Sequence, residues 1–160
     1  MEKLDSPKLS DVKIEDRFWS RYIKLVREKM LPYQWEVLND RVNDAAKSHC
    51  IENFKIAAKE STGKYYGMVF QDTDVAKWLE ALAYSLEGEK NGELEKEADE
   101  VIDLIGRAQQ QDGYLDTYYT IQEPLGRWSN LREGHELYTA GHMIEAAAAY
   151  YQATGKDRFF

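Results

Sequence analysis

The chain has almost no cysteine, because Cys50 is the only one among 160 residues. An intrachain disulfide needs two cysteines, so none is expected, and this usage is typical of a reducing compartment. Residues 1–19, MEKLDSPKLSDVKIEDRFW, contain no apolar run of the kind that signal peptides carry. No stretch approaches the roughly 18 apolar residues that span a membrane. The sequence therefore predicts a cytoplasmic protein with no membrane partner.

The chain also lacks the clusters of positive charge that bind nucleic acids or anionic lipids. Its 21 basic residues are scattered and are outnumbered by 29 acidic ones, which gives a net charge of −8. Nucleic acid is therefore not expected as a partner. The composition is 43% hydrophobic and 12% aromatic, which is too apolar for a disordered chain. A length of 160 residues suits one domain.

Apolar residues recur at spacings of three and four over most of the chain, which predicts helices. A first helix is expected from Asp16 to Met30, with a kink or interruption at Pro32 and a continuation through QWEVLND. A short helix is expected in IENFKIAAKES. Residues 1–13 are expected to form an extended segment ahead of these helices.

The most regular helical pattern follows the segment FQDTD. Asp72 or Thr73 can cap the exposed N–H groups of this helix, and Asp74 places negative charge in its first turn. A second helix should follow and end near the turn sequence QDG. The apolar stripes of the two helices are Val75, Trp78, Leu79, Leu82 and Leu86, and Leu94, Ala98, Val101, Ile102, Ile105 and Ala108.

The last predicted helix, from about Gly134 to Ala153, has two distinct faces. One face is expected to pack against the rest of the chain, and the other is polar and rich in ring systems. A polar face with rings is typical of a helix that lines a cavity. The expected packing face consists of Leu137, Ile144, Ala148 and Tyr151. The polar, ring-bearing face consists of His135, Tyr138, His142 and Glu145.

Taken together, these patterns predict an all-α protein of about five helices in consecutive hairpins. The sequence has no strand-like alternation of useful length. It ends with TGKDRFF, in which one helix stops and the pattern of another begins. This ending indicates a fragment of a longer protein.

The residues alone leave the role of the histidines open. His135 and His142 are seven positions apart, or about 10 Å along a helix, which is too far for both to bind one ion at about 2.1 Å. His49 next to Cys50 does not make an activated thiol, because sequence adjacency is not spatial pairing. A sugar site is one interpretation of the ring-bearing face, with the carboxylates of FQDTD nearby. The other interpretation is structural: the histidines pack in the core, and the aspartates only cap a helix.

Three long segments resemble glycoside hydrolase family 127, whose type activity is β-L-arabinofuranosidase. They are GMVFQDTDVAKWLEA, RAQQQDGYLDTYY and HELYTAGHMIEAAAAYYQATG. FW near the start, PYQWEVLND and KSH resemble the opening segment of the family, so the resemblance runs from about residue 14 to 153. It implies an (α/α)6 barrel with the substrate in a central cavity. The helical hairpins of this chain would form about half of that barrel.

The resemblance also implies a retaining mechanism with a cysteine nucleophile, a glutamate acid/base, and zinc bound by a glutamate and cysteines. All of these belong to the later part of the family's sequence. No catalytic residue and no bound metal are therefore expected in this chain, and zinc is expected in the complete enzyme. Cys50 does not lie in the nucleophile motif.

The resemblance implies that His135, the histidine of HELY, contacts the arabinofuranose. His142, Tyr138, Asp72, Asp74 and His49 are further candidates for substrate binding, since they lie in matching motifs.

Residues 1–160 are thus expected to be the N-terminal portion of a catalytic domain, which is inactive alone and acts on L-arabinofuranosyl saccharides when complete. Unpartnered apolar faces would favour self-association, such as a homodimer. The alternative is a non-enzymatic carbohydrate-binding module or a truncated product without function.

Overall fold

The computed structural model describes residues 7–160, and the regular elements of this range are all helical. This confirms the all-α prediction. The expected extended segment is only partly tested, because residues 1–6 lie outside the described range and Leu9–Asp11 form a turn of 3-10 helix. The helices are α1 (Trp19–Leu25), α2 (Leu31–Leu38), α3 (Cys50–Ala57), α4 (Asp72–Gly88), α5 (Gly92–Ala108), α6 (Thr117–Ile121) and α7 (Glu136–Thr154).

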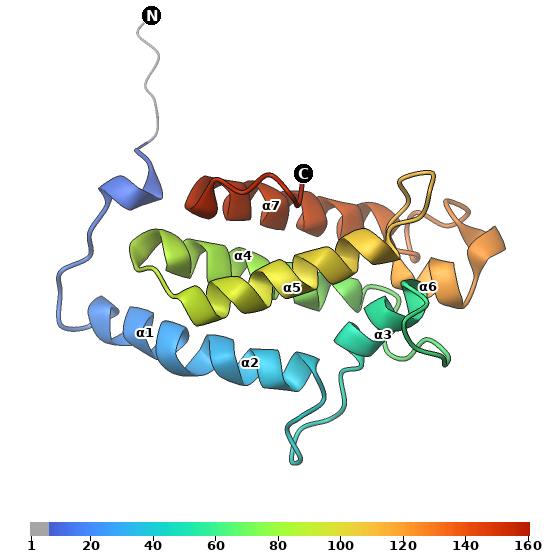
Figure 1. The fold of residues 1–160 in the computed structure, drawn as a ribbon, viewed down its shortest axis with the longest axis horizontal. Coiled ribbons are helices and arrows are strands. Elements are labelled where there is room, and N and C mark those ends of the chain that lie inside the picture. The colour runs from blue at the N-terminus through green and yellow to red at the C-terminus, as the bar shows by residue number, and fades with distance from the viewer. Residues whose placement is uncertain (1–6) are drawn as a thin grey trace, which may run out of the picture.

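Helices α1 and α2 run end to end (Figure 1). The Asp16 carboxylate begins α1 by accepting hydrogen bonds from the backbone N–H groups of Phe18 and Trp19, at 2.7 and 2.6 Å. A π-helical turn, Val26–Met30, separates the two helices, and Pro32 lies in the first turn of α2. Proline lacks the N–H that would close an ordinary helical turn, so a wider turn precedes it. The predicted interruption is therefore confirmed, just ahead of the proline.

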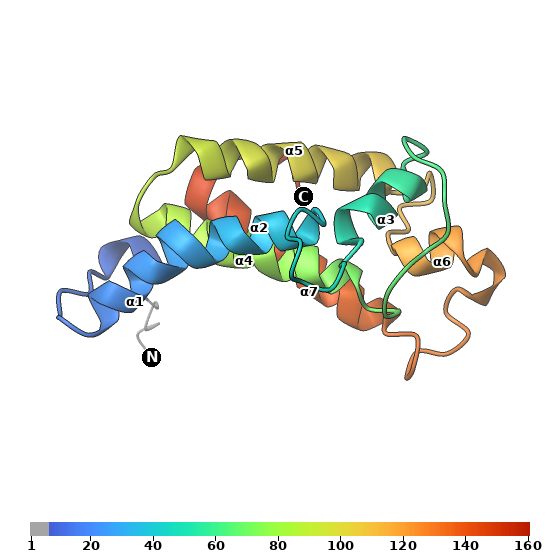
Figure 2. The ribbon, with the colours of Figure 1, turned by 90° about the horizontal axis from the view of Figure 1, so that it is seen from below.

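The long helices lie side by side and alternate in direction (Figures 1 and 2). The α1–α2 pair and α5 run one way, whereas α4 and α7 run the other way, and the short helices α3 and α6 gather at one end. Helices α4 and α5 form the predicted hairpin. Helix α7, however, packs along α4 and forms no hairpin with the helix that precedes it. The prediction of consecutive hairpins is thus correct for only part of the chain.

Helix α4 lies at the centre of the core, and both predicted apolar stripes of α4 and α5 are buried with at most 4% exposure. The indole rings of Trp35 and Trp78 stack between α2 and α4, with centroids 4.6 Å apart. The indole N–H of Trp78 donates a 3.1 Å hydrogen bond to the carbonyl of Leu31. Across residues 7–160, every helix is too short or too polar to cross a membrane.

The predicted packing face of α7 is wrong. Leu137, Ile144 and Tyr151 are 60%, 67% and 47% exposed, so this stripe points away from the chain. The face that packs is rich in alanine, because small side chains let two helix backbones approach closely. Its buried apolar members are Met143, Ala146, Ala147, Ala149, Tyr150 and Ala153.

The Trp78 indole should contribute measurably to stability. We expect Trp78→Phe to lower the free energy of unfolding by about 1–3 kcal/mol, because the bond to Leu31 is lost and a small cavity forms. Urea titration followed by circular dichroism measures this change. Trp19→Phe is the matched control, since Trp19 is 59% exposed and should change stability by less than about 0.5 kcal/mol. Equal effects of the two substitutions would contradict the stabilising role of the Trp78 indole.

Candidate functional site

A row of aromatic rings runs from the segment before α4 along α7. The ring centroid of Phe70 lies 5.1 Å from that of His135, which lies 6.0 Å from Tyr138, and Tyr138 lies 4.5 Å from His142. The ring-bearing face that the sequence predicts is therefore a continuous row in space. Phe70 was not predicted, because a lone aromatic residue outside a helix gives no periodic signal.

His135 lies directly before α7 in a left-handed backbone conformation, with φ of 55°. This conformation is uncommon for residues other than glycine, and it turns the chain sharply into the helix. Atom Nδ1 lies 2.7 Å from the carbonyl oxygen of Glu133. A carbonyl only accepts, so Nδ1 carries the proton and Nε2 of the neutral ring is left as an acceptor. His135 is half-buried and can offer this acceptor to a hydroxyl.

The middle of the row is held by a cation from α4. The Lys77 ammonium donates to the Tyr138 hydroxyl at 3.0 Å and to the Thr73 hydroxyl at 3.2 Å. It also lies 5.1 Å from the centroid of the Tyr138 ring, which is the range of a cation–π contact. These contacts fix the phenol of Tyr138 between α4 and α7.

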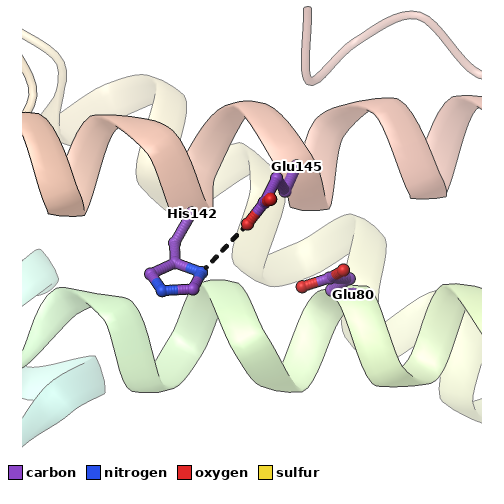
Figure 3. Close-up of side chains that lie close together, drawn as sticks. All are labelled: Glu80, His142 and Glu145. Atoms are coloured by element: carbon purple, nitrogen blue, oxygen red, sulfur yellow. Dashed lines mark ion pairs between the residues drawn. The ribbon is translucent and has the colours of Figure 1, made fainter.

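His142 ends the row beside two carboxylates (Figure 3). Its Nδ1 lies 3.3 Å from Oε2 of Glu145, one turn further along α7. Glu80 faces them from α4 and accepts a 3.0 Å hydrogen bond from the Tyr84 hydroxyl. The sequence predicted that His142 and Glu145 share a face, but it gave no sign of Glu80.

Asp72 ties α4 to α6 and does not cap α4. Its two carboxylate oxygens accept hydrogen bonds from the backbone N–H and the hydroxyl of Thr117, at 2.7 and 2.5 Å. The side chain makes no capping bond, so the capping interpretation of Asp72 is wrong. Burial raises the pKa of Asp72 to about 6, although the bonds from Thr117 lower it. Asp72 is 2% exposed and joins α4 to α6, and substrate binding by this residue stays a prediction.

Two further carboxylates, Asp116 and Glu136, are each 2% exposed, and the sequence did not predict either. Oδ1 of Asp116 caps α6 by accepting the Tyr119 N–H at 3.1 Å, while Oδ2 is buried without a partner. Burial, together with the charge of Asp72, raises the pKa of Asp116 to about 7. Glu136 accepts bonds from the Tyr114 hydroxyl and, at 2.8 Å, from the backbone N–H of Trp128.

The other two predicted residues, Asp74 and His49, are not members of the ring row. Asp74 is exposed, accepts a 3.2 Å hydrogen bond from Gln71, and lines an open cleft between α2 and α4 with Lys77. His49 has a left-handed φ of 54°, and its Nδ1 lies 3.1 Å from the Asp40 carboxylate. Burial raises the pKa of Asp74, and the charge of Lys77 opposes this. Substrate binding by either residue stays a prediction.

Cys50 is a buried thiol with no exposed surface. The Ser48 hydroxyl and the Gln71 amide donate hydrogen bonds to its sulfur at 2.8 and 3.3 Å. Burial raises the pKa of Cys50 to about 11, so the sulfur carries its proton at neutral pH. Zinc bound by several cysteines does not fit the residues of this chain, because Cys50 is the only cysteine in the sequence.

The fold matches solved glycoside hydrolases. A crystal structure of a GH127 β-L-arabinofuranosidase from Geobacillus stearothermophilus T6 superimposes with a TM-score of 0.90 at 67% identity. A second GH127 β-arabinofuranosidase gives 0.83 at 37% identity. Residues 11–160 match the family described as "Beta-L-arabinofuranosidase, GH127 catalytic domain". The chain therefore belongs to glycoside hydrolase family 127, and its helices form part of an (α/α)6 barrel.

The chain spans about a quarter of the length of these relatives. A curated relative from Bifidobacterium longum subsp. longum, "Non-reducing end beta-L-arabinofuranosidase", is 43% identical over an alignment of 164 positions. The alignment covers 92% of this chain and 25% of the relative. The two solved structures cover 92% and 94% of this chain, which spans 23% and 24% of theirs. The residues described above therefore correspond to only a part of the full-length relatives.

The buried carboxyls should make the protein less stable as the pH rises. The pKa of Asp116 is 3.8 in an ordinary setting and about 7 here, so the folded chain binds this proton more tightly than the unfolded chain. Its stabilising contribution is complete at pH below 3.8 and is lost as the pH rises through 7. We therefore expect Asp116→Asn to raise the free energy of unfolding at both pH values, and by on the order of 2 kcal/mol more at pH 7.5 than at pH 5.

Denaturant titrations at the two pH values measure this difference. The asparagine can keep the cap on α6 through its carbonyl oxygen. Asp157→Asn, at an exposed position, is the control and should change stability equally little at both pH values. A gain that is the same at pH 5 and pH 7.5 would show that Asp116 is ionised throughout this range.

Proposed function

We propose that this chain forms one wall of the substrate cavity in an enzyme that hydrolyses terminal β-L-arabinofuranosides. Membership of the family and the names of its relatives support the substrate class. The reacting cysteine and glutamate of the retaining mechanism, and the zinc, are assigned to the part of the relatives' length that this chain does not span. The buried thiol of Cys50 suits a reducing compartment, and we place the protein in the cytoplasm.

The observation that carries this proposal is the ring row together with the hydrogen-bond acceptor that His135 supplies within it. A sugar presents apolar C–H groups that pack on rings and hydroxyls that need hydrogen-bond partners. Phe70, Tyr138 and His142 supply rings, and Nε2 of His135 supplies an acceptor whose tautomer is fixed by Glu133. In this arrangement Nε2 of His135 accepts a hydrogen bond from a sugar hydroxyl and orients the sugar ring for attack by groups elsewhere in the enzyme.

The left-handed backbone of His135 fits this role. A strained conformation persists where surrounding structure holds it, and such conformations cluster at functional sites. Here the neighbouring Glu136 is held on both carboxylate oxygens by Tyr114 and Trp128. The imidazole is thereby presented at the entrance to α7 with little freedom, which reduces the entropy lost when a sugar binds.

A graft into a relative tests the proposal. Residues 11–160 would replace the matching segment of the Geobacillus stearothermophilus enzyme, to which this chain is 67% identical. The graft should hydrolyse a nitrophenyl β-L-arabinofuranoside, whereas the isolated 160-residue chain should not. In the graft, His135→Ala should lower kcat/KM roughly ten- to a hundredfold, because a buried hydrogen bond to a sugar hydroxyl is lost.

The comparison within the ring row is His142→Ala, for which we expect a smaller kinetic effect. A thermal melt of each variant separates the two interpretations of His135. A packing role predicts a lower melting temperature with unchanged kinetics of the folded enzyme. A stably folded His135→Ala graft with the unmodified graft's kcat/KM would refute the proposed sugar contact, and an inactive, folded graft would refute the proposed activity.

The outward face of α7 should make the isolated chain self-associate. Leu137, Ile144 and Tyr151 are exposed together on one helix, and apolar patches of this kind favour association. Light scattering coupled to gel filtration should show dimers or larger species, and Leu137→Lys with Ile144→Lys should shift them to monomers. Leu125→Lys is the control, since Leu125 is 101% exposed in the 3-10 helical turn Pro124–Gly126 and its replacement should leave the distribution unchanged. A monodisperse monomer of the unmodified chain would contradict this expectation.

A further inference from the structure

Glu80, His142 and Glu145 form a compact cluster, in which Glu80 and Glu145 have no part in the proposed sugar contact. One nitrogen or oxygen from each residue lies within 4.8 Å of those from the other two. His142 and Glu145 are three positions apart on α7, which places them on the same face. Glu80 reaches toward them from α4, so the cluster joins the two helices (Figure 3).

The spacing within the cluster matches the coordination shell of a metal ion. His142 Nδ1 and Glu145 Oε2 are 3.3 Å apart. Two ligands on a tetrahedral ion, each bound at about 2.0–2.1 Å, are separated by about 3.4 Å. An ion can therefore bind both atoms without moving α7, and the flexible side chain of Glu80 can supply a third ligand from α4. The fourth position would be left to water.

The histidine nitrogen in this cluster lacks a hydrogen-bond partner. Nδ1 of His142 is buried and, within residues 7–160, no donor or acceptor satisfies it, since the contact with Glu145 is close but not aligned as a hydrogen bond. Buried polar atoms without a partner are rare in folded proteins. The ring is nevertheless well oriented, because its edge-to-face contact with Tyr138 has an interplanar angle of 89° and Lys77 holds that phenol.

The charge of the cluster also favours a cation. In the described part of the chain, neither Glu80 nor Glu145 forms an ion pair with a lysine or an arginine. The nearest lysine along α4, Lys77, is engaged by Thr73 and Tyr138. Two carboxylates held near one another repel unless a positive charge lies between them.

We propose that Glu80, His142 and Glu145 bind one divalent transition-metal ion of the zinc type, which braces α4 against α7. Imidazole with carboxylates suits Zn²⁺, whereas Ca²⁺ prefers a shell of oxygen ligands alone. This site is separate from the cysteine-containing zinc centre that the family resemblance implies. It also does not depend on the proposed sugar contact of His135, and a brace of this kind stabilises the wall of the cavity without taking part in catalysis.

Calorimetric titration of ZnCl₂ into the metal-free 160-residue chain tests the site. We expect one ion per chain and a melting temperature that rises with zinc. Glu80→Gln and Glu145→Gln should each weaken zinc binding at least tenfold, because each removes a charged ligand. Glu100→Gln, an exposed carboxylate of α5 with 64% side-chain exposure, should leave the affinity unchanged. CaCl₂ should give no saturable heat.

Absence of zinc binding would overturn the proposal. So would zinc affinity that is equal in the unmodified chain, Glu80→Gln and Glu145→Gln, which would show adventitious binding elsewhere, or equal affinity for calcium. Loss of folding does not obscure the result, because the Glu145 side chain is 62% exposed and its replacement by glutamine removes no packing. Circular dichroism of each metal-free variant verifies this. Failure of zinc binding leaves the graft experiment on His135 unaffected, so the two proposals can be judged separately.

Discussion

The close packing of α7 along α4 is the contact on which the site depends. Alanines on the buried face of α7, such as Ala146 and Ala149, let the two helices approach along their whole length. Side chains at the edges of this contact between α4 and α7 then meet in pairs: Lys77 contacts Tyr138, and Glu80 approaches His142. Replacing one of these alanines by a larger residue would push α7 away from α4. Both pairs would then be separated at once, because both depend on the same distance between the helices.

The end of the molecule near α6 is held by buried polar groups where the rest of the core is apolar. Asp72, Asp116 and Glu136 each lose most of their hydration on folding, and this raises the pKa of the two aspartates. Such groups cost stability unless they are paired. They fix the direction of the connection between α6 and α7, and that connection ends at His135. The order of the ring row is therefore maintained by groups that make the fold less stable at neutral pH.

Periodicity in the sequence predicted α4, α5 and the ring-bearing face of α7, because one helix face is a local property of the chain. It could not tell which face of α7 is buried, since Leu137 and Ile144 resemble core residues and only the position of α4 shows that the alanine face packs. Glu80 and Phe70 were missed for a related reason. Their partners lie far away in the sequence, and no spacing rule joins them. Their role follows from tertiary structure alone.

The parallel orientation of α4 and α7 has an electrostatic consequence. Aligned peptide dipoles place about half a positive charge at the N-terminus of a helix. Because the two helices run the same way, their positive ends lie at the same end of the molecule. Asp72 and Glu136 are the first residues of these helices, so each buried carboxylate lies where the helix dipole partly offsets its lost hydration. His135 lies at this end as well, where the field of both helices favours electron-rich ligand atoms.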